Sequence, residues 1–460
     1  MNVGKCVKPY QLVWLAAVLL VLFMVILPPV FGIGGGAQYE VLTRVGLFSS
    51  GGDSSVISGS YGITEGTGAQ GFHEILLLAL VKLCGAWGTF PIGLLGGVYA
   101  IIFLAALYVI LKYLQGARLW VNIAVSALVV LIFCDLGYVA YFNSFYQDAL
   151  SFVLVFALAA MVLSMRHQVT WWKLALYTVL AAAFVLTRRQ NILIGLWLVF
   201  LPLAEIRKLS DAKWMKIGGW ICAAVIMLSM LDSVICTPVP AEQESKFNAV
   251  YYGALKDSKN VEADAAALGV KPDFAGKSYY DVAEADRSAA EPVSYRQLEK
   301  FYFSHPSALL RELKIAANNS YFLTQGYLNY QQDGAAGGFK SHVALKVWSF
   351  LKRTVLPQGL WVILIFCAAY LGVCIAQVRK YRAAGDAKNR FLAEVLKILP
   401  LAALFELVGT VILTGEAAIS RNLFCFGIYF DFMLVSALIW GIVTVLERRH
   451  VMKTKYGVNQ

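Results

Sequence analysis

Runs of about 20 apolar residues recur along this sequence, and its charged residues collect between those runs. One helix of that length crosses the hydrocarbon core of a bilayer. Hydrophobic residues make up 59% of the 460 positions and charged residues 15%, which excludes an ordinary soluble domain. The sequence therefore predicts an all-α polytopic membrane protein surrounded by a lipid bilayer.

We expect about ten transmembrane helices, judged by the length of the apolar runs. The expected spans are residues 12–31, 91–114, 119–141, 150–165, 174–186, 192–206, 217–236, 360–378, 391–413 and 423–446. The fifth and sixth are short, so they form either two spans or one broken element.

The short loops on one side of these spans are rich in lysine and arginine. They comprise residues 112–118, 166–173, 207–216, 379–390 and 448–455. By the positive-inside rule, this bias places both termini in the cytoplasm of a multi-pass protein of the cell membrane. Much of the net charge of +11 lies in these loops, so contact with anionic lipid explains it better than binding to nucleic acid.

The same span count divides the chain into three parts. Residues 1–236 form an N-terminal membrane domain with an outer loop at 32–90. Residues 237–356, between the seventh and eighth spans, form a mostly helical extracytoplasmic domain, since this stretch is long enough for a small domain. Residues 357–460 form a C-terminal membrane domain with a cytoplasmic tail.

Polar side chains gather at the outer end of the third and fourth spans, in the stretch YFNSFYQDALSF at 141–152. Polar groups near membrane depth are costly, and they tend to line a cavity or a reaction site. The alternative is that Asn143 and Asp148 only cap the flanking helices, with Asp148 at a helix start where the dipole favours a negative charge.

Arg188, Arg189 and Arg421 lie at the same outer face, against the charge bias of translocated short loops. They either pair with nearby acids and hold helix ends, or bind the phosphate of a lipid-linked substrate with their planar guanidinium groups. The sequence leaves both roles open.

A further set of acids lies within or near the ends of spans, where such residues form proton relays in transporters. The set comprises Asp135, Asp232, Glu406 and Asp431, and no pairing among them is visible. Walker, dinucleotide-binding, HExxH and paired CxxC motifs are absent from the sequence, so a nucleotide substrate is not expected and no metal site is predicted.

The pattern resembles the polytopic glycosyltransferases of the GT-C superfamily, and more narrowly the WsfD-like hexosyltransferases of bacterial surface-glycan synthesis. The segments that carry this resemblance are YFNSFYQDALSF, the stretch 247–270, FYFSHPSALLREL at 301–313 and QGYLNY at 325–330. The resemblance implies transfer of a hexose from a polyprenyl-phosphate donor to a cell-surface glycan or glycolipid acceptor on the outer face.

Such enzymes carry an acidic base in the first outer loop, directly after the first span. Here that place reads GIGGGAQYE, so Glu40 is the first candidate for the base. Asp148 is the second candidate and Asp53 the third. The base would take the proton from an acceptor hydroxyl as its oxygen attacks the anomeric carbon in a direct displacement.

The resemblance also implies a set of substrate-binding residues. Arg421 and either Arg188 or Arg189 would stabilise the charge that develops on the departing polyprenyl phosphate. A divalent cation, Mg or Mn, would share that task, although the sequence shows no ligand set for it. The set is completed by Asn143, Tyr146, His73 and His305.

Two other functions fit the same composition. One is a flippase or transporter of lipid-linked sugars, although the internal repeats common in transporters are not evident here. The other is a surface-polysaccharide polymerase or ligase, whose donor would be a lipid diphosphate. A donor assay separates these alternatives from hexose transfer.

Overall fold

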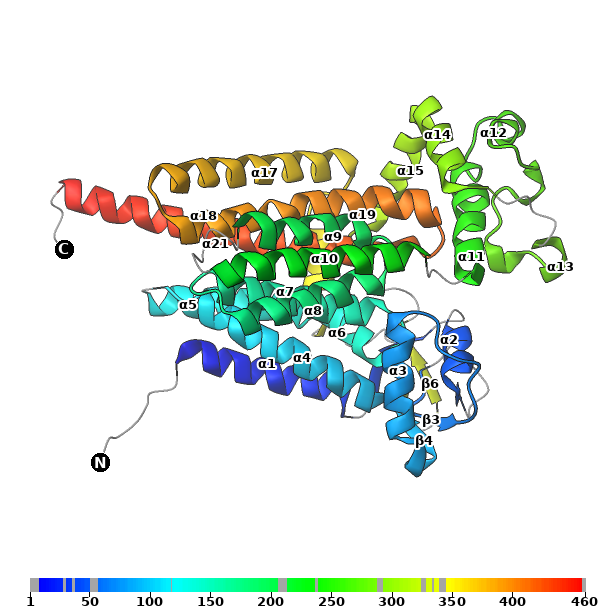
Figure 1. The fold of residues 1–460 in the computed structure, drawn as a ribbon, viewed down its shortest axis with the longest axis horizontal. Helices are drawn as coiled ribbons and strands as arrows, with labels where there is room; N and C mark the ends of the chain where they lie inside the picture. Colours follow the sequence, from blue (N-terminus) through cyan, green and yellow to red (C-terminus); the bar gives the residue numbers. More distant parts are fainter. Residues whose placement is uncertain are drawn as a thin grey trace.

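The computed structural model describes residues 8–456, apart from residues 28–29, 35–37, 50–56, 117, 206–212, 236–238, 288–292, 324–327, 333–334 and 339–344. Long helices lie side by side along the longest axis of the molecule (Figure 1). The first helix begins and the last helix ends at the same end of this bundle, which we call the termini end. The segments that join the helices at the opposite end form a separate layer there, and we call it the domain end.

The bundle consists of helices that coincide with the apolar runs of the sequence. They are α1 (Pro9–Val25), α4 (Ile92–Tyr113), α5 (Leu119–Phe133), α7 (Asp148–Met165), α8 (Trp171–Thr187), α9 (Asn191–Phe200), α10 (Lys213–Ile235), α17 (Leu360–Ala383), α18 (Ala387–Leu396), α19 (Ile398–Thr414) and α21 (Phe424–Tyr456). The prediction of an all-α polytopic membrane protein is confirmed.

Within the described residues, six helices are long and apolar enough to cross a membrane, or seven if one bent pair counts as a single span. The bent pair joins α5 to α6 (Leu136–Val139) and the following 3-10 turn at an angle of 46°. The bend follows from Asp135, whose side chain accepts a hydrogen bond from the Gly137 amide at 2.8 Å and so starts a new helix. The helices α1, α8 and α9 match expected spans but are shorter than this criterion requires.

The first apolar run ends its helix earlier than expected, at Val25, and continues as strand β1 (Val30–Ile33). Pro28 and Pro29 explain why the helix does not continue, because proline lacks the amide hydrogen that an interior helical position donates. Strand β1 pairs antiparallel with β5 (Leu328–Gln332), which pairs in turn with β6 (Ala335–Gly338). A segment that follows the first helix is therefore joined to the end of the outer segment, a pairing that sequence patterns did not predict.

Most of the remaining elements lie at the domain end (Figure 1). The segment between α1 and α4, which we call the first outer loop after its predicted side, contains α2 (Gln38–Val45), α3 (Phe72–Leu83) and a second sheet of β2 (Leu47–Phe48), β3 (Ser60–Ile63) and β4 (Thr89–Pro91). The segment between α10 and α17, which we call the outer segment for the same reason, contains α11 (Val239–Ala249), α12 (Val261–Leu268), α13 (Glu284–Arg287), α14 (Tyr295–Ser304), α15 (Pro306–Asn319) and α16 (Val347–Thr354). Its mostly helical character agrees with the prediction.

Aromatic side chains pack where α4, α5 and α7 meet. Phe156 lies edge-on to Phe103 and to Phe133, with ring centroids 4.9 Å apart in both pairs. Such pairs each contribute about 0.5–1.5 kcal/mol beyond the area that they bury. Because lipid solvates apolar side chains as well as protein does, close packing of this kind is what holds membrane helices in place. It fixes α7, which carries Asp148 at its first turn.

Two of the acids that resembled a proton relay instead attach α16 to the bundle. The Asp135 carboxylate accepts hydrogen bonds from the backbone amides of Trp348 at 2.8 Å and Ser349 at 3.1 Å. Asp431 on α21 pairs with Lys352 at 2.9 Å. Each of these carboxylates is satisfied by α16, so they tie this helix to α6 and α21.

Candidate functional site

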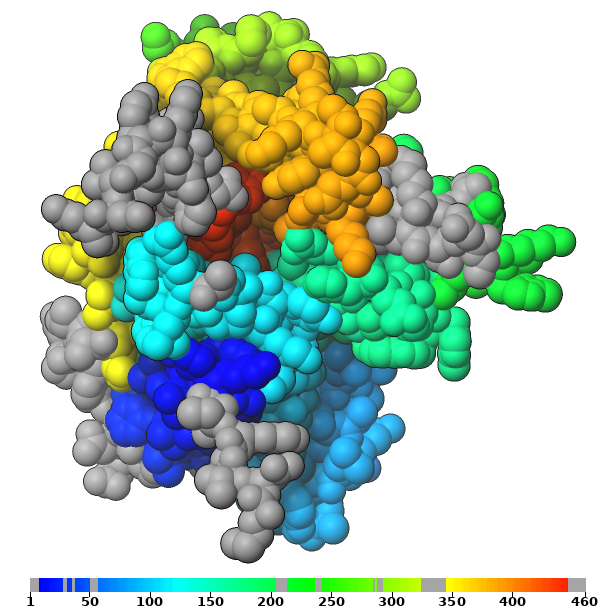
Figure 2. All heavy atoms as spheres, turned by 90° about the vertical axis from the view of Figure 1, so that its left-hand side faces the viewer, coloured from blue at the N-terminus to red at the C-terminus, as the bar shows by residue number. Residues whose placement is uncertain are grey.

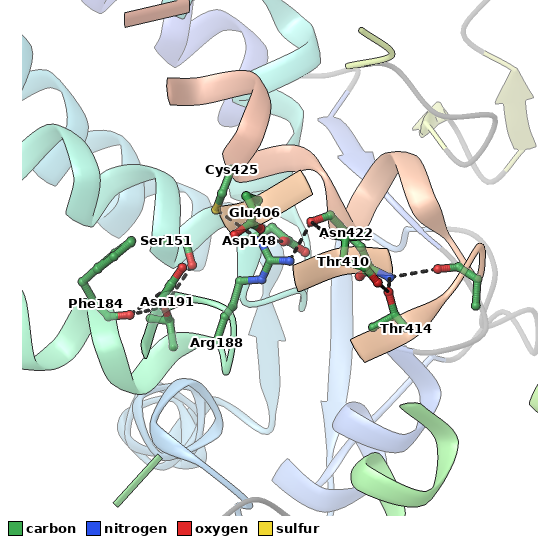
Figure 3. Close-up of polar contacts among 12 residues, drawn as sticks. Asp148, Ser151, Phe184, Arg188, Asn191, Glu406, Thr410, Thr414, Asn422 and Cys425 are labelled. Atoms are coloured by element: carbon green, nitrogen blue, oxygen red, sulfur yellow. Dashed lines mark hydrogen bonds and ion pairs between the residues drawn. The ribbon is translucent and has the colours of Figure 1, made fainter. Parts of the chain in front are cut away.

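A buried ionic cluster forms at the domain end of the bundle around Arg188, the residue that follows α8 (Figure 3). Its backbone is extended, with φ −146° and ψ 141°, which ends the helix and turns the side chain among its neighbours. Asn191 at the start of α9 stabilises this turn, because its side chain donates to the Phe184 carbonyl at 2.9 Å and to Thr187 Oγ1 at 2.8 Å. Arg188 is therefore held by the connection between α8 and α9.

The Arg188 guanidinium meets groups from four other helical segments, α7, α19, α20 (Ile419–Asn422) and α21. Its Nη1 lies 3.0 Å from Glu406 on α19 and 3.4 Å from Asp148 on α7. The same nitrogen donates to Cys425 Sγ at 3.1 Å, and Nη2 donates to the Asn422 carbonyl at 2.8 Å. Asp148, Arg188 and Glu406 are each at most 4% exposed. One arginine thus holds two carboxylates together out of contact with water.

Arg421 approaches the same cluster from α20. Its guanidinium lies over the Tyr146 ring, 4.6 Å from the ring centroid, and its charge interacts with that of Asp148. The residue that starts α20, Ala418, has a φ of 45°, in the left-handed region that non-glycine residues rarely adopt. The strained turn delivers Arg421 to the cluster, so two cations and two carboxylates lie close together at this end of the bundle.

The outer segment is packed closely against the loop that carries Arg421. A Cβ added to Gly415 would lie 2.6 Å from the Asn248 carbonyl oxygen and 2.9 Å from Gly253 Cα, so only glycine allows this approach. Next to it, the Glu416 amide donates to the Tyr252 carbonyl at 3.2 Å. The outer segment thereby covers one side of the cluster.

A second set of acids lies nearer to the surface, between the first outer loop and the outer segment. The Tyr280 hydroxyl is 3.3 Å from Glu40 Oε1 and 3.0 Å from Glu244 Oε2. Burial raises the pKa of Glu244, and the nearby charge of Arg421 opposes that rise. Glu40 also pairs with Arg44 at 3.3 Å, and its side chain is 50% exposed. Glu244 connects this solvent-facing rim electrostatically to Arg421.

Several residues of the predicted set have partners of their own. Asn143 is fully buried and donates from Nδ2 to the carbonyls of Val25 and Phe31, both at 2.9 Å. It therefore ties the end of α1 and strand β1 to the third span, a structural task that leaves no exposed surface for a substrate. Tyr146, by contrast, is half-buried beneath Arg421.

The remaining predicted residues lie elsewhere. His73 is buried, its Nε2 lies 3.1 Å from the Tyr99 hydroxyl, and burial lowers its pKa to about 4. His305 starts α15 and stacks on Phe301 at 4.5 Å, with Nδ1 3.1 Å from the Phe301 carbonyl. Arg189 pairs with Glu242 at 3.7 Å. Within the described part of the chain, these contacts of His73, His305 and Arg189 do not involve the Arg188 cluster, and Asp53 lies outside the described residues.

The family follows from a comparison over nearly the whole chain. A family model described as the YfdI N-terminal transmembrane domain matches residues 2–459. The chain belongs to this family. No curated protein matches it.

Among solved structures, this YfdI N-terminal transmembrane domain is similar to the archaeal oligosaccharyltransferase AglB from Archaeoglobus fulgidus, solved in complex with an inhibitory peptide and a dolichol-phosphate. The TM-score is 0.41 and the sequence identity 12%. The similarity covers 98% of this chain and 52% of the archaeal one, so the chain spans about half the length of that protein.

Sequence reasoning identified Asp148, Arg188 and Arg421 in this YfdI-type domain but not their partners. Glu406 stands out in the sequence as an acid within an apolar run, but the neighbouring residues do not show that it faces Arg188. Glu244 and Tyr280 do not stand out, because charged residues and tyrosines are common in segments exposed to water. Among the described residues, no group of three or more histidines, cysteines or acids is placed to hold a metal ion.

A pH-dependent stability is expected from Glu312, which lies on α15 in the outer segment and is 1% exposed. Burial and the neighbouring charge of Glu416 raise its pKa to about 7 from an ordinary value of 4.5. The folded protein then binds a proton that the unfolded chain releases, so this contribution to stability is fully present below pH 4.5 and is lost as pH rises through about 7.

We therefore expect the thermal unfolding midpoint of the purified YfdI-type domain to fall between pH 5 and pH 8, and to fall less in the Glu312→Gln variant, which cannot ionise. Glu299→Gln, an exposed acid on α14, serves as the matched control and should keep the slope of the unmodified protein. Identical pH profiles for the Glu312→Gln variant and the unmodified protein would show that Glu312 does not titrate in this range.

Proposed function

We propose that this chain is a membrane glycosyltransferase that moves a hexose from a polyprenyl-phosphate donor to a cell-surface glycan or glycolipid acceptor at the domain end. The observation that carries the proposal is the cluster of Arg188 and Arg421 with Asp148 and Glu406 beneath a covering outer segment. Buried charges are expensive, and a protein that keeps four of them together at the edge of a membrane domain has a chemical use for them.

The two arginines suit different tasks. Arg188 is engaged with Asp148, Glu406 and the Asn422 carbonyl, so we assign it the task of positioning the carboxylates and the α20 loop. Arg421 stacks on Tyr146, and its charge interacts with those of Asp148 and Glu244. We propose that Arg421 binds the phosphate of the donor, because a planar guanidinium can bind two phosphate oxygens at once and stabilise the charge of a leaving phosphate.

The candidate bases differ in their surroundings. Asp148 is buried and ion-paired, which favours an electrostatic task, whereas Glu40 is half-exposed and within reach of an acceptor. We propose Glu40 as the base. It takes the proton of the acceptor hydroxyl, the oxygen forms a bond to the anomeric carbon, and the bond to the polyprenyl phosphate breaks with its electron pair leaving on the phosphate.

The proposal is tested with the purified protein in liposomes, supplied with polyprenyl-phosphate hexoses and an envelope-glycan acceptor. We expect sugar transfer by the unmodified protein, and a loss of about 10²–10⁴-fold in Glu40→Gln, the range for removal of a general base. Asp148→Asn should also lose transfer, through a disturbed Arg188. Glu65→Gln, an exposed acid of the same outer loop, is the matched control and should keep full activity.

Other outcomes would replace the proposal. Transfer only from a lipid-diphosphate oligosaccharide would identify a polymerase or ligase. Movement of the sugar lipid between leaflets with no transfer would identify a flippase. Full activity in Glu40→Gln with loss in Asp148→Asn would keep the enzyme class and remove Glu40 as the base.

A further inference from the structure

A large apolar cavity lies inside the bundle, toward the termini end. Its volume is about 480 Å³, within the range of roughly 300–1,000 Å³ that small-molecule sites occupy. Helices α4, α5, α7, α18, α19 and α21 contribute to its wall. Seen from the termini end, α21 (red) is set back between the cyan segment of α5 and the orange segments of α17 and α18 (Figure 2). The wall is almost entirely hydrocarbon, so it suits an apolar chain.

The cavity has the depth of about one leaflet. On α7 it is lined from Val155 to Arg166, and eleven steps of 1.5 Å along a helix amount to roughly 16 Å. The hydrocarbon core of a bilayer is about 30 Å thick, so roughly half of it is matched. The lining residues do not include Asp148, Arg188 or Glu406, and the cavity is therefore separate from the site proposed for glycosyl transfer.

Polar groups stand at both ends of this apolar space. At its inner end the Tyr429 hydroxyl is buried without a hydrogen-bond partner, on a residue that is 3% exposed. At the termini end Arg166 and Gln377 line the mouth, and Arg166 Nε and Gln377 Oε1 are likewise buried without a partner. Buried polar atoms are normally satisfied, so unpaired atoms around a cavity point to a ligand that completes them.

The mouth is also basic. Arg166 donates from Nη2 to Asn389 Oδ1, which fixes the guanidinium at the rim. Desolvation lowers the pKa of His167, and so do the nearby charges of Arg166, Lys388 and Lys173. One carboxylate, Asp386, lies at the same end, where hydrogen bonds from Asn389 and the charge of Arg166 lower its pKa. A basic pocket between membrane helices, placed at the level of the lipid headgroups, is a typical binding site for an anionic lipid.

We propose that this cavity binds an anionic phospholipid from the leaflet at the termini end, with one acyl chain inside the bundle and the phosphate on Arg166. The occupant is a phospholipid of that leaflet because the cationic mouth and the unpaired polar atoms of the rim lie at the termini end, while the cavity stops short of the Arg188 cluster. A sugar donor with its phosphate at the domain end would leave the Arg166 mouth without an anion. The inference does not depend on the proposed function.

The test is native mass spectrometry of the full-length protein released from nanodiscs that contain phosphatidylglycerol or phosphatidylcholine. We expect one phosphatidylglycerol to remain bound, and its retention to fall at least tenfold in Arg166→Gln, which keeps a hydrogen-bonding group for Asn389. Arg379→Gln removes one charge at an exposed position of α17 that does not line the cavity, and should retain the lipid. Ala159→Phe, which fills the apolar wall without changing charge, should expel it.

Three results would overturn the proposal. Equal losses in Arg166→Gln and Arg379→Gln would indicate attraction by the charged surface and not a site. Retention of phosphatidylcholine to the same extent as phosphatidylglycerol would show that the site does not select an anionic headgroup. Displacement of phosphatidylglycerol by polyprenyl phosphate at equal concentration would assign the cavity to the sugar-carrier lipid. Each variant is compared only if it elutes as a single species and keeps the unfolding midpoint of the unmodified protein. If Ala159→Phe fails to fold, Ala402→Leu is the second cavity-filling variant.

Discussion

Replacing Arg421 with glutamine is expected to lower sugar transfer by about 10²–10³-fold, the usual effect of removing one group that stabilises developing charge. This expectation rests on the position of Arg421, which stacks on Tyr146 beside Asp148. Arg188, by contrast, is ion-paired with both Asp148 and Glu406. Glutamine keeps most of the side-chain length, so the α20 loop should stay folded. The rate is measured in liposomes at saturating donor and again at low donor concentration.

The matched control for this result is Arg353→Gln, since Arg353 is an exposed arginine at the domain end that lies over the Phe322 ring. It should transfer sugar at the unmodified rate. A loss confined to low donor concentration would mean that Arg421 binds the donor and its transition state equally. Unchanged turnover under both conditions would remove Arg421 from the site.

Replacing Lys352 with alanine is expected to lower the free energy of unfolding by about 3–5 kcal/mol, because it leaves the Asp431 carboxylate buried without its countercharge. Both residues are fully buried and 2.9 Å apart. The second carboxylate oxygen of Asp431 accepts from Tyr138 of α6 and from Trp348 of α16, so loss of the countercharge also disturbs these two contacts. Unfolding in detergent, followed by tryptophan fluorescence, measures the loss.

The control is the double variant Lys352→Met with Asp431→Asn, which removes both charges and keeps an acceptor for Tyr138 and Trp348. It should recover most of the lost stability, since a buried ion pair is often replaceable by neutral groups of similar volume. If the double variant is as unstable as Lys352→Ala, packing at residue 352 and not the unpaired charge is responsible.

The helices could be predicted from the sequence because the bilayer sets the length of every apolar run. The ends of the helices could not be predicted in the same way, because single residues can stop a helix or start a new one inside an apolar run. Asp135 breaks the third span by capping a new helix, and Pro28 and Pro29 stop the first. The strand pairing of β1 with β5 depends on residues that are far apart in the chain, and a single sequence contains no local mark of such a pairing.

The candidate site was predictable to a similar extent. A charge at membrane depth stands out in any sequence, which is why Asp148, Arg188 and Arg421 were found. Which charge meets which depends on the rotation of each helix, and apolar runs without a polar face do not specify it. For this reason Glu406 was noticed without its partner, and Asn143 was expected to bind a substrate when it holds two backbone carbonyls.

The sheet that joins Val30–Ile33 to Leu328–Gln332 has a consequence for biosynthesis. Ribosomes add about 5–20 residues per second, so strand β1 waits roughly 15–60 s for its partner to be synthesised. During that time its backbone groups form an open edge, of the kind that invites wrong pairing between chains. In the finished fold the Asn143 amide is bonded to the Phe31 carbonyl while β5 pairs with the same strand, so this bond positions β1 without taking the place of β5. The edge that receives β5 is therefore completed only late in synthesis, after most of the membrane helices have been made.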